Sequence, residues 1–275
     1  MHKNIFLASY PKSGNTWLRS IIGNFYNFDK EFSLNNIKSI PLLSIKKHFS
    51  EFDNKVYINN KELHFDWISQ NIIKCQNLLN NKTNHLNIFK THSARHKNFT
   101  NETVNAGFIY IVRDPRDIIV SLKNFSGKEI DKTIDEFLFS KSLMISTNGA
   151  QELLSTWELN VQSWLNYKSV PRLMIKYEDL KLNPKEIILN IKEFLNNTHR
   201  LKINLSDQDI DKIIENTKFN NLKKLEDKNG FDEATKHSKF FRSGTSNQWK
   251  DVLTNTQVKL IEKNLKSLMR YFNYI

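Results

Sequence analysis

The sequence predicts a single α/β domain in which helices flank a central parallel sheet. Four short runs rich in Ile, Val, Phe or Tyr are typical of buried strands, and helical patterns lie between and after them. Strands that alternate with helices form parallel sheets that are covered on both faces. No linker rich in Pro, Gly or Ser divides the 275 residues, so we expect one domain over residues 1–275.

The expected strands are 4–9, 86–90, 107–113 and 172–177. The expected helices are 15–25, 66–79, 115–125, 134–145, 151–167, 184–195, 207–216 and about 255–271. Pro115 and Pro184 stand at the start of two of these helices, where a missing N–H costs nothing. Ligands of such sheets bind beyond the carboxyl ends of the strands, so the residues directly after each strand are the first candidates for a functional site.

Charge indicates little about the partner of this protein. The net charge is +12, and a basic surface attracts anions. The lysines are scattered, however, and accompany heavy Asn and Ile usage, which suggests a biased, microbial source genome. A nucleic-acid binder would need clustered cations interleaved with exposed aromatic residues, whereas the aromatic residues here follow core spacing. We therefore expect no nucleic acid as a partner.

Neither a membrane span nor a signal peptide is expected. No apolar run approaches the length of a membrane span, and the run at 5–8 is too short for a signal peptide core. The single cysteine, Cys75, cannot form an internal disulfide and lies in an apolar periodic stretch, so we expect a buried thiol. These observations predict a cytoplasmic protein.

The stretch after the first strand, SYPKSGNTW at 9–17, nearly matches the phosphate-binding loop G-x-x-x-x-G-K-[ST]. Gly14 and Thr16 fit the pattern, but Ser replaces its first Gly and Asn15 replaces its Lys. Lys12 is in reach of a phosphate from the loop itself. The N-terminus of the following helix suits an anion. A P-loop kinase for a small metabolite is one alternative, and Asn15 argues against it.

The second strand is followed by FKTHS, which contains Lys90 and His92. A neutral imidazole at a strand end is suited to take a proton from a hydroxyl group. A lone histidine in this position is more often a surface or hydrogen-bonded residue. The neighbouring Lys90 and the anion-binding loop favour catalysis.

The third strand is followed by VRDPRDIIVSL, with Arg113 at the strand end and Ser121 on the next helix. An arginine fork with a hydroxyl group is a receptor for a phosphate monoester. A surface network of Arg and Asp, with Ser121 at a packing position, is an equally good interpretation of this motif alone.

The last two motifs are KYEDL, after the fourth strand, and FRSGTSNQWK near the C-terminus. Tyr177 is placed to bond a base edge or a phosphate, whereas Glu178 and Asp179 are interpreted as helix caps. The late loop combines a cation, a glycine and small hydroxyl groups, so its backbone is able to form an anion-binding nest. A merely solvated loop has a similar composition.

These five motifs, in this order, resemble the cytosolic-type sulfotransferases, which use 3′-phosphoadenosine 5′-phosphosulfate (PAPS). The likeness extends from about Phe6 to Thr254. It implies a P-loop NTPase-like fold with a loop that binds 5′-phosphosulfate, PAPS as the co-substrate, and no metal ion. It also explains Asn15, because a sulfuryl donor has no polyphosphate chain and needs no Mg²⁺ to bridge two phosphates.

The resemblance assigns the donor site residue by residue. The residues implied at the 5′-phosphosulfate are Lys12, Ser13, Gly14, Asn15, Thr16 and Trp17, with Trp17 near the adenine. The residues implied at the 3′-phosphate are Arg113 and Ser121, completed by Arg242, Ser243 and Gly244. The residues implied near the adenine are Tyr177, Thr217 and Phe219.

The resemblance also assigns the catalytic groups. His92 matches the catalytic base and Lys90 the lysine beside it. Lys12 is implied to face the bridging oxygen of the donor, and Ser121 to hold Lys12 aside until an acceptor is bound. The implied reaction is an in-line transfer of the sulfuryl group to a hydroxyl or amine of a small-molecule or glycan acceptor. A catalytically inactive relative that only binds nucleotide remains an alternative.

Two motifs depart from the family pattern. Ser243 replaces the middle lysine of R-K-G, which implies a weaker 3′-phosphate site or another cation there. The dimer motif K-x-x-x-T-V-x-x-x-E retains Lys250 and Thr254 but has Asn255 and Lys259 in place of its Val and Glu. The sequence therefore leaves the oligomeric state open.

The acceptor is not identified by any motif. We expect it to be shaped by residues 26–60, 125–155 and 226–239, whose polar character favours a glycan or hydroxylated metabolite over a steroid.

Overall fold

The chain consists of two compact units, which we describe separately. The computed structural model describes residues 3–25, 32–53, 55–56, 61, 63–82, 85–147, 149–199, 201–234, 237 and 239–275. Unit 1 contains Met1–Tyr10, Pro41–Tyr110 and Ser140–Met174, and unit 2 contains Pro11–Ile40, Ile111–Phe139 and Ile175–Ile275. None of the helices in these ranges is both long and apolar enough to span a membrane.

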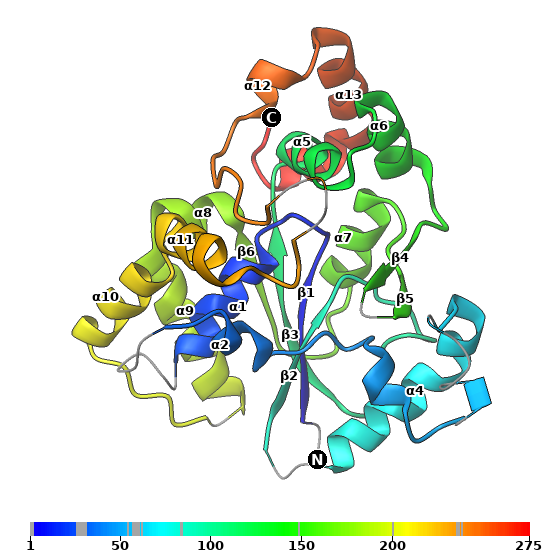
Figure 1. The fold of residues 1–275 in the computed structure, drawn as a ribbon, viewed down its shortest axis with the longest axis vertical. Helices are drawn as coiled ribbons and strands as arrows, with labels where there is room; N and C mark the ends of the chain where they lie inside the picture. The colour runs from blue at the N-terminus through cyan, green and yellow to red at the C-terminus, as the bar shows by residue number, and fades with distance from the viewer. Residues whose placement is uncertain are drawn as a thin grey trace. The chain divides into compact units, whose positions relative to one another are not determined.

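Figure 1 labels the elements along the chain. The strands are β1 (Asn4–Ser9), β2 (Asn87–Thr91), β3 (Asn105–Val112), β4 (Met144–Thr147), β5 (Ala150–Leu153) and β6 (Arg172–Lys176). The helices of unit 1 are η1 (Lys46–Phe49), α4 (Phe65–Asn81) and α7 (Trp157–Leu165). Those of unit 2 are α1 (Asn15–Asn24), α2 (Asn35–Lys38), α5 (Pro115–Ser126), α6 (Ile130–Phe139), α8 (Tyr177–Leu182), α9 (Pro184–His199), α10 (Asp207–Asn216), α11 (Phe219–Asn229), α12 (Trp249–Val252) and α13 (Asn255–Tyr271).

The main sheet has the strand order β2-β1-β3-β6, and the boundary between the units passes through β3 and β6. Strands β1 and β2 run parallel, with Asn4 opposite Asn87 and Ala8 opposite Thr91, and Figure 1 shows them side by side. The predicted class, α/β with a central parallel sheet, is confirmed. The expected strands match the observed ones to within two residues at each end.

The core of unit 1 is aromatic and lies between the sheet and α7. The Trp164 ring contacts Phe6 and Phe108 at centroid distances of 5.9 and 5.0 Å. Its indole N–H also donates to the carbonyl of Ser93, at 3.0 Å. Helix α7 therefore supports the segment that follows β2.

Cys75 is buried on α4, and burial raises the pKa of its thiol to about 12, as expected for a core thiol.

The helices expected over 134–145 and 151–167 are partly wrong, because a β-hairpin separates them. Thr147 of β4 pairs with Ala150 of β5 in antiparallel register. The sequence between them is Asn-Gly, which is typical of a two-residue hairpin turn, and Gly149 has φ 76°. A local turn signal therefore overrides the helical spacing of the apolar residues.

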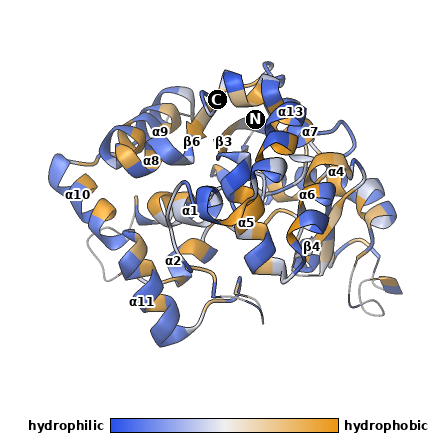
Figure 2. Cartoon of the chain, turned by 90° about the horizontal axis from the view of Figure 1, so that it is seen from above, coloured by the Kyte–Doolittle hydropathy of each residue, from blue (hydrophilic) through white to orange (hydrophobic). Residues whose placement is uncertain are grey.

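The helices of unit 2 pack in two groups. One group contains α5, α6, α12 and α13, and the other contains α1, α2 and α8–α11 (Figure 1). Figure 2 shows hydrophobic and hydrophilic residues on the same helices, as in α9 and α10, which is typical of helices that bury one face. Thr254, which belongs to the incomplete dimer motif, accepts a hydrogen bond from the Gln257 N–H and caps α13.

Candidate functional site

The loop between β1 and α1 adopts backbone conformations that few residues tolerate. Lys12 has φ 67° and Gly14 has φ 102°. A Cβ atom at Gly14 would lie 2.6 Å from Cδ2 of Tyr177, so only glycine fits there. The Ser13 hydroxyl oxygen is buried and has no hydrogen-bond partner within the described part of the chain. A buried donor at a helix N-terminus is suited to an anion.

Lys12 extends from this loop into an aromatic cradle. Its Nζ lies 4.2 Å from the ring centroid of Phe125 on α5 and 4.1 Å from that of Phe240. Aromatic faces attract an ammonium group in this geometry. Ser121 lies half-buried on α5, one turn before Phe125. The expected contact between Ser121 and Lys12 remains a prediction.

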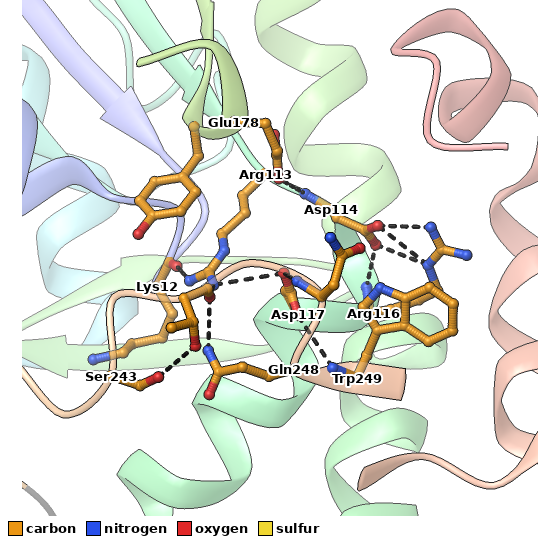
Figure 3. A network of polar contacts seen from close by, with 12 residues as sticks. Lys12, Arg113, Asp114, Arg116, Asp117, Glu178, Ser243, Gln248 and Trp249 are labelled. Atoms are coloured by element: carbon orange, nitrogen blue, oxygen red, sulfur yellow. Dashed lines mark hydrogen bonds and ion pairs between the residues drawn. The ribbon is translucent and has the colours of Figure 1, made fainter. Parts of the chain in front are cut away.

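Arg113 lies at the centre of a polar network that joins two loops (Figure 3). Its Nη1 donates to the carbonyl of Lys12 at 3.1 Å, and its Nη2 donates to the carbonyl of Thr245 at 2.9 Å. The guanidinium lies over the ring of Tyr177, 4.4 Å from its centroid, and Nε is buried without a hydrogen-bond partner among the described residues. Arg113 is therefore a buried tie between the first and last motifs. The Arg–Asp network of the alternative interpretation is present, but it is buried and does not lie on the surface, and the phosphate-receptor role of Arg113 remains a prediction.

Asp117 is a functional candidate that sequence reasoning missed. It is 1% exposed, lies one turn after Arg113 and forms an ion pair with it at 3.7 Å. Its carboxylate accepts the backbone N–H groups of Asn247 and Trp249 at 2.8 and 3.2 Å. Burial raises the pKa of Asp117, although Arg113 and the two N–H groups act in the opposite direction. The i,i+4 spacing of the Arg–Asp pair was a signal for this contact.

Residues expected near the adenine meet around Tyr177. Its hydroxyl donates to the carbonyl of Gly244 at 3.2 Å, and Trp17 packs edge-on against its ring at a centroid distance of 5.7 Å. Gly244 has φ 63°, and a Cβ there would lie 2.3 Å from Cδ2 of Phe219. The structure therefore brings Trp17, Tyr177, Phe219 and Gly244 together within unit 2.

Three other residues of the expected donor site have mainly local contacts. The Thr217 hydroxyl is buried and donates to the carbonyl of Ile213 in its own helix. Arg242 is exposed and donates to Gln248 Oε1 at 2.5 Å, and the hydroxyl groups of Ser243 and Thr245 lie 2.5 Å apart. Their role at the 3′-phosphate remains a prediction.

Two carboxylates hold segments around the loops, and the sequence did not reveal their contacts. Glu233 accepts from the Thr16 hydroxyl at 3.1 Å and pairs with the buried Arg19 at 2.5 Å. Glu178 was expected to cap a helix. Instead its two oxygens accept the backbone N–H of Asp114 and the Tyr274 hydroxyl, both at 3.1 Å, and burial raises its pKa. Glu178 therefore ties the C-terminal residues to the start of α5.

His92, in unit 1, is held in one tautomer by its neighbours. Its Nδ1 lies 2.8 Å from the carbonyl oxygen of Ser9, the last residue of β1. A carbonyl only accepts, so Nδ1 carries the proton, and the lone pair of neutral imidazole is on Nε2. The His92 carbonyl accepts from Asn160 Nδ2 at 2.9 Å, and its N–H donates to Glu152 Oε1 at 3.1 Å. This arrangement is suited to a general base that acts through Nε2.

Lys90 lies on β2, two residues before His92, and is 5% exposed. Its backbone N–H donates to the Pro41 carbonyl and its carbonyl accepts from the Leu43 N–H, both at 2.8 Å. The segment around Pro41 thus extends the edge of the sheet at Lys90.

Within the regions expected to shape the acceptor site, residues 26–31, 54, 57–60, 148, 235–236 and 238 lie outside the described residues.

Comparison with known proteins places the whole chain in one family. The sulfotransferase domain family matches residues 2–273. A flavonol 3-sulfotransferase of Flaveria bidentis is 26% identical and covers 95% of this chain and 80% of its own. An amine sulfotransferase of Oryctolagus cuniculus is 22% identical, and the match covers 98% of this chain and 81% of the relative.

Solved structures share the fold of this chain. A mouse sulfotransferase complexed with PAP superposes with a TM-score of 0.65 at 22% identity, covering 98% of this chain and 85% of the other. Retinol dehydratase in complex with androsterone and PAP superposes with a TM-score of 0.64 at 18% identity, and the match covers 97% of this chain and 80% of the other. The family match extends over nearly every residue and includes all five motifs. The chain therefore belongs to the sulfotransferase family, and it is a sulfotransferase enzyme.

Proposed function

We propose that this enzyme transfers the sulfuryl group of PAPS to a hydroxyl or amine of a small-molecule or glycan acceptor. The observation that carries the proposal is the convergence, in unit 2, of the loop before α1, Arg113 and the loop around Gly244 on Tyr177. Family membership favours sulfuryl transfer over the kinase and nucleic-acid alternatives. The names of relatives include flavonol and amine sulfotransferases, which supports both acceptor chemistries.

The donor site fits a nucleotide that carries separate anionic groups. The Ser13 hydroxyl and Arg113 Nε are buried donors without partners in the described residues, and buried donors of this kind are normally satisfied. We place the 5′-phosphosulfate on Lys12–Thr16 and the 3′-phosphate on Arg113, Ser121, Arg242, Ser243 and Gly244. We place the adenine by Trp17, Tyr177, Thr217 and Phe219.

PAPS supplies a sulfuryl group that is joined through one oxygen to the 5′-phosphate. In the proposed reaction His92 Nε2 takes the proton of the acceptor hydroxyl or amine. A bond forms between the acceptor atom and sulfur while the bond from sulfur to the bridging oxygen breaks. The electron pair of that bond passes to the phosphate oxygen, and 3′-phosphoadenosine 5′-phosphate (PAP) is the second product.

Charge develops on the sulfuryl and bridging oxygens during this step. We assign its stabilisation to Lys12, Lys90 and the N-terminus of α1, because fixed positive groups lower the barrier where negative charge develops. Lys12 would act from the aromatic cradle of Phe125 and Phe240, which restricts the position of its ammonium group.

The test compares the wild-type chain with His92→Ala, using PAPS and 4-nitrophenol and measuring PAP release by chromatography. A flavonol and a primary amine serve as further acceptors. Loss of the general base is expected to lower kcat by about 100-fold or more. The affinity for PAP should be unchanged, and His64→Ala, an exposed histidine of unit 1, should behave as wild type. Persistent transfer by His92→Ala would refute the assigned base, and lost PAP affinity would show that His92 supports the donor site instead.

A further inference from the structure

Glu152 is a fully buried carboxylate behind the segment that carries His92. It belongs to β5 and is 0% exposed. Its Oε1 accepts hydrogen bonds from the Thr91 hydroxyl at 2.8 Å, the His92 N–H at 3.1 Å and the Ser93 hydroxyl at 3.3 Å. Three consecutive residues at the end of β2 are therefore fixed by a single oxygen atom.

The second oxygen of Glu152 is not explained by this structural role. Oε2 is buried and has no hydrogen-bond partner within the described part of the chain. Burial raises the pKa of this carboxyl, which means that the charged form is costly, although its bonds and the charge of Lys90 offset part of that cost. Burying a charge in this way rarely favours stability, and a neutral side chain of the same shape would avoid the penalty.

The surroundings of His92 make this charge useful to a base. Four elements contribute groups to these surroundings. Strand β5 contributes Glu152, β2 contributes the cation Lys90, and β1 and α7 contribute the neutral Ser9 and Asn160. When Nε2 takes a proton, the imidazole becomes a cation, and Lys90, whose charge acts on Glu152, is a second cation in this set. Glu152 is then the nearby negative group in this set of contacts.

We propose that Glu152 is a positioning residue that holds His92 in place and compensates the imidazolium charge formed during sulfuryl transfer. This inference rests on the proposed role of His92 as the base. The proton taken from the acceptor stays on His92 Nε2 in this step and is not passed to Glu152. The effect acts through the fixed Thr91–Ser93 segment and through the field of the carboxylate.

The test is Glu152→Gln, which retains an Oε1 acceptor for the three donors and removes the charge. Glu158→Gln on α7 is the matched control, because it makes the same change six residues away at a half-buried site. Transfer from PAPS to 4-nitrophenol is measured against pH, PAP binding is measured by calorimetry, and the His92 ring is followed by NMR of ¹⁵N-histidine-labelled protein.

Glu152→Gln is expected to lower kcat about tenfold and to leave PAP affinity unchanged. A carboxylate favours protonated imidazole, so its removal should move the acidic limb of the kcat profile and the His92 NMR midpoint to lower pH, by about one unit. Glu158→Gln should alter neither. Thr91→Val, which removes one bond and keeps the carboxylate, should lower kcat by a smaller factor and leave the His92 midpoint near that of the wild type.

If Glu152→Gln has the kcat and the His92 NMR midpoint of the wild type while His92→Ala is inactive, the role of Glu152 is overturned and the proposed base is not. Activity in His92→Ala would instead overturn the proposed base, so the two failures are distinguishable. If Glu152→Gln does not fold, Thr91→Val decides: an unchanged kcat together with unchanged PAP affinity would reject the positioning role.

Discussion

The loops of unit 2 and the His92 segment of unit 1 are built in opposite ways. At His92, the ring Nδ1, the backbone N–H and the carbonyl all have partners on neighbouring elements. In the loops of unit 2, Ser13 Oγ, Trp17 Nε1 and Arg113 Nε are buried without hydrogen-bond partners among the residues described. The described residues therefore position His92, the proposed base, whereas the proposed donor site has polar atoms that no described residue satisfies.

The backbone conformations of these two regions also differ. The loops of unit 2 contain positive φ values at Lys12, Gly14, Gly244 and Asn247, whereas His92 directly follows a regular strand. Such conformations persist only where the surrounding structure holds them. Changes in the loops should therefore appear as lost donor affinity, and changes around His92 as lost turnover.

The largest effect on the donor side is expected from Gly244→Ala. Its Cβ would meet the Phe219 ring at 2.3 Å, so the loop must move away from Tyr177 and Arg113. Overpacking of about 1–3 kcal/mol would weaken PAP binding by roughly 5–150-fold, measured by calorimetry. Gly230→Ala is the matched control, because Gly230 has a similar φ of 70° but nothing within 4 Å of its Cβ position.

Gly230→Ala should cost about 1–3 kcal/mol of unfolding free energy, because φ 70° with ψ 172° is a backbone conformation that essentially only glycine adopts, and it should retain PAP affinity. The comparison between the two regions fails if both glycine variants bind PAP equally well. It also fails if Gly244→Ala lowers kcat at saturating donor while its PAP affinity is normal.

A smaller effect is expected from Asp117→Asn. The variant removes the charge that pairs with Arg113 and weakens the bonds to the N–H groups of Asn247 and Trp249. Loss of one charge-assisted anchor is worth about 1–2 kcal/mol, so PAP affinity should fall by about tenfold, again measured by calorimetry. At saturating PAPS, kcat should remain near wild type. A large fall in kcat with unchanged affinity would show that this loop also acts on the chemical step.

Much of the fold was predictable because its signals are local. Strand β1 and helices α10 and α13 have the predicted ends, since apolar runs and capping residues such as Thr254 mark them. The order of the motifs also predicted which loops would meet, because parallel strands direct their carboxyl ends to one edge. Within unit 2, Arg113, Tyr177 and Gly244 lie together, and their role in donor binding remains a prediction.

The missed features depend on contacts between distant residues. Glu152 is 60 positions from His92 and Asp117 is 130 from Asn247, and no local pattern reports such pairs. The hairpin at Gly149 was missed because the apolar residues on either side of the Asn-Gly turn also follow helical spacing. The cradle of Lys12 was also unexpected, since it joins α5 to the late loop through Phe125 and Phe240.

The most direct test of the central claim is calorimetric titration of the full chain with PAP, in metal-free buffer, against adenosine 5′-phosphate and ATP. We predict tight binding of PAP that requires the 3′-phosphate and is lost in Arg113→Ala, while the control Arg172→Ala, an exposed arginine of β6, binds as wild type. Equal or tighter binding of ATP, or binding of PAP that is indifferent to Arg113, would contradict the assignment of this site to a PAPS-type donor.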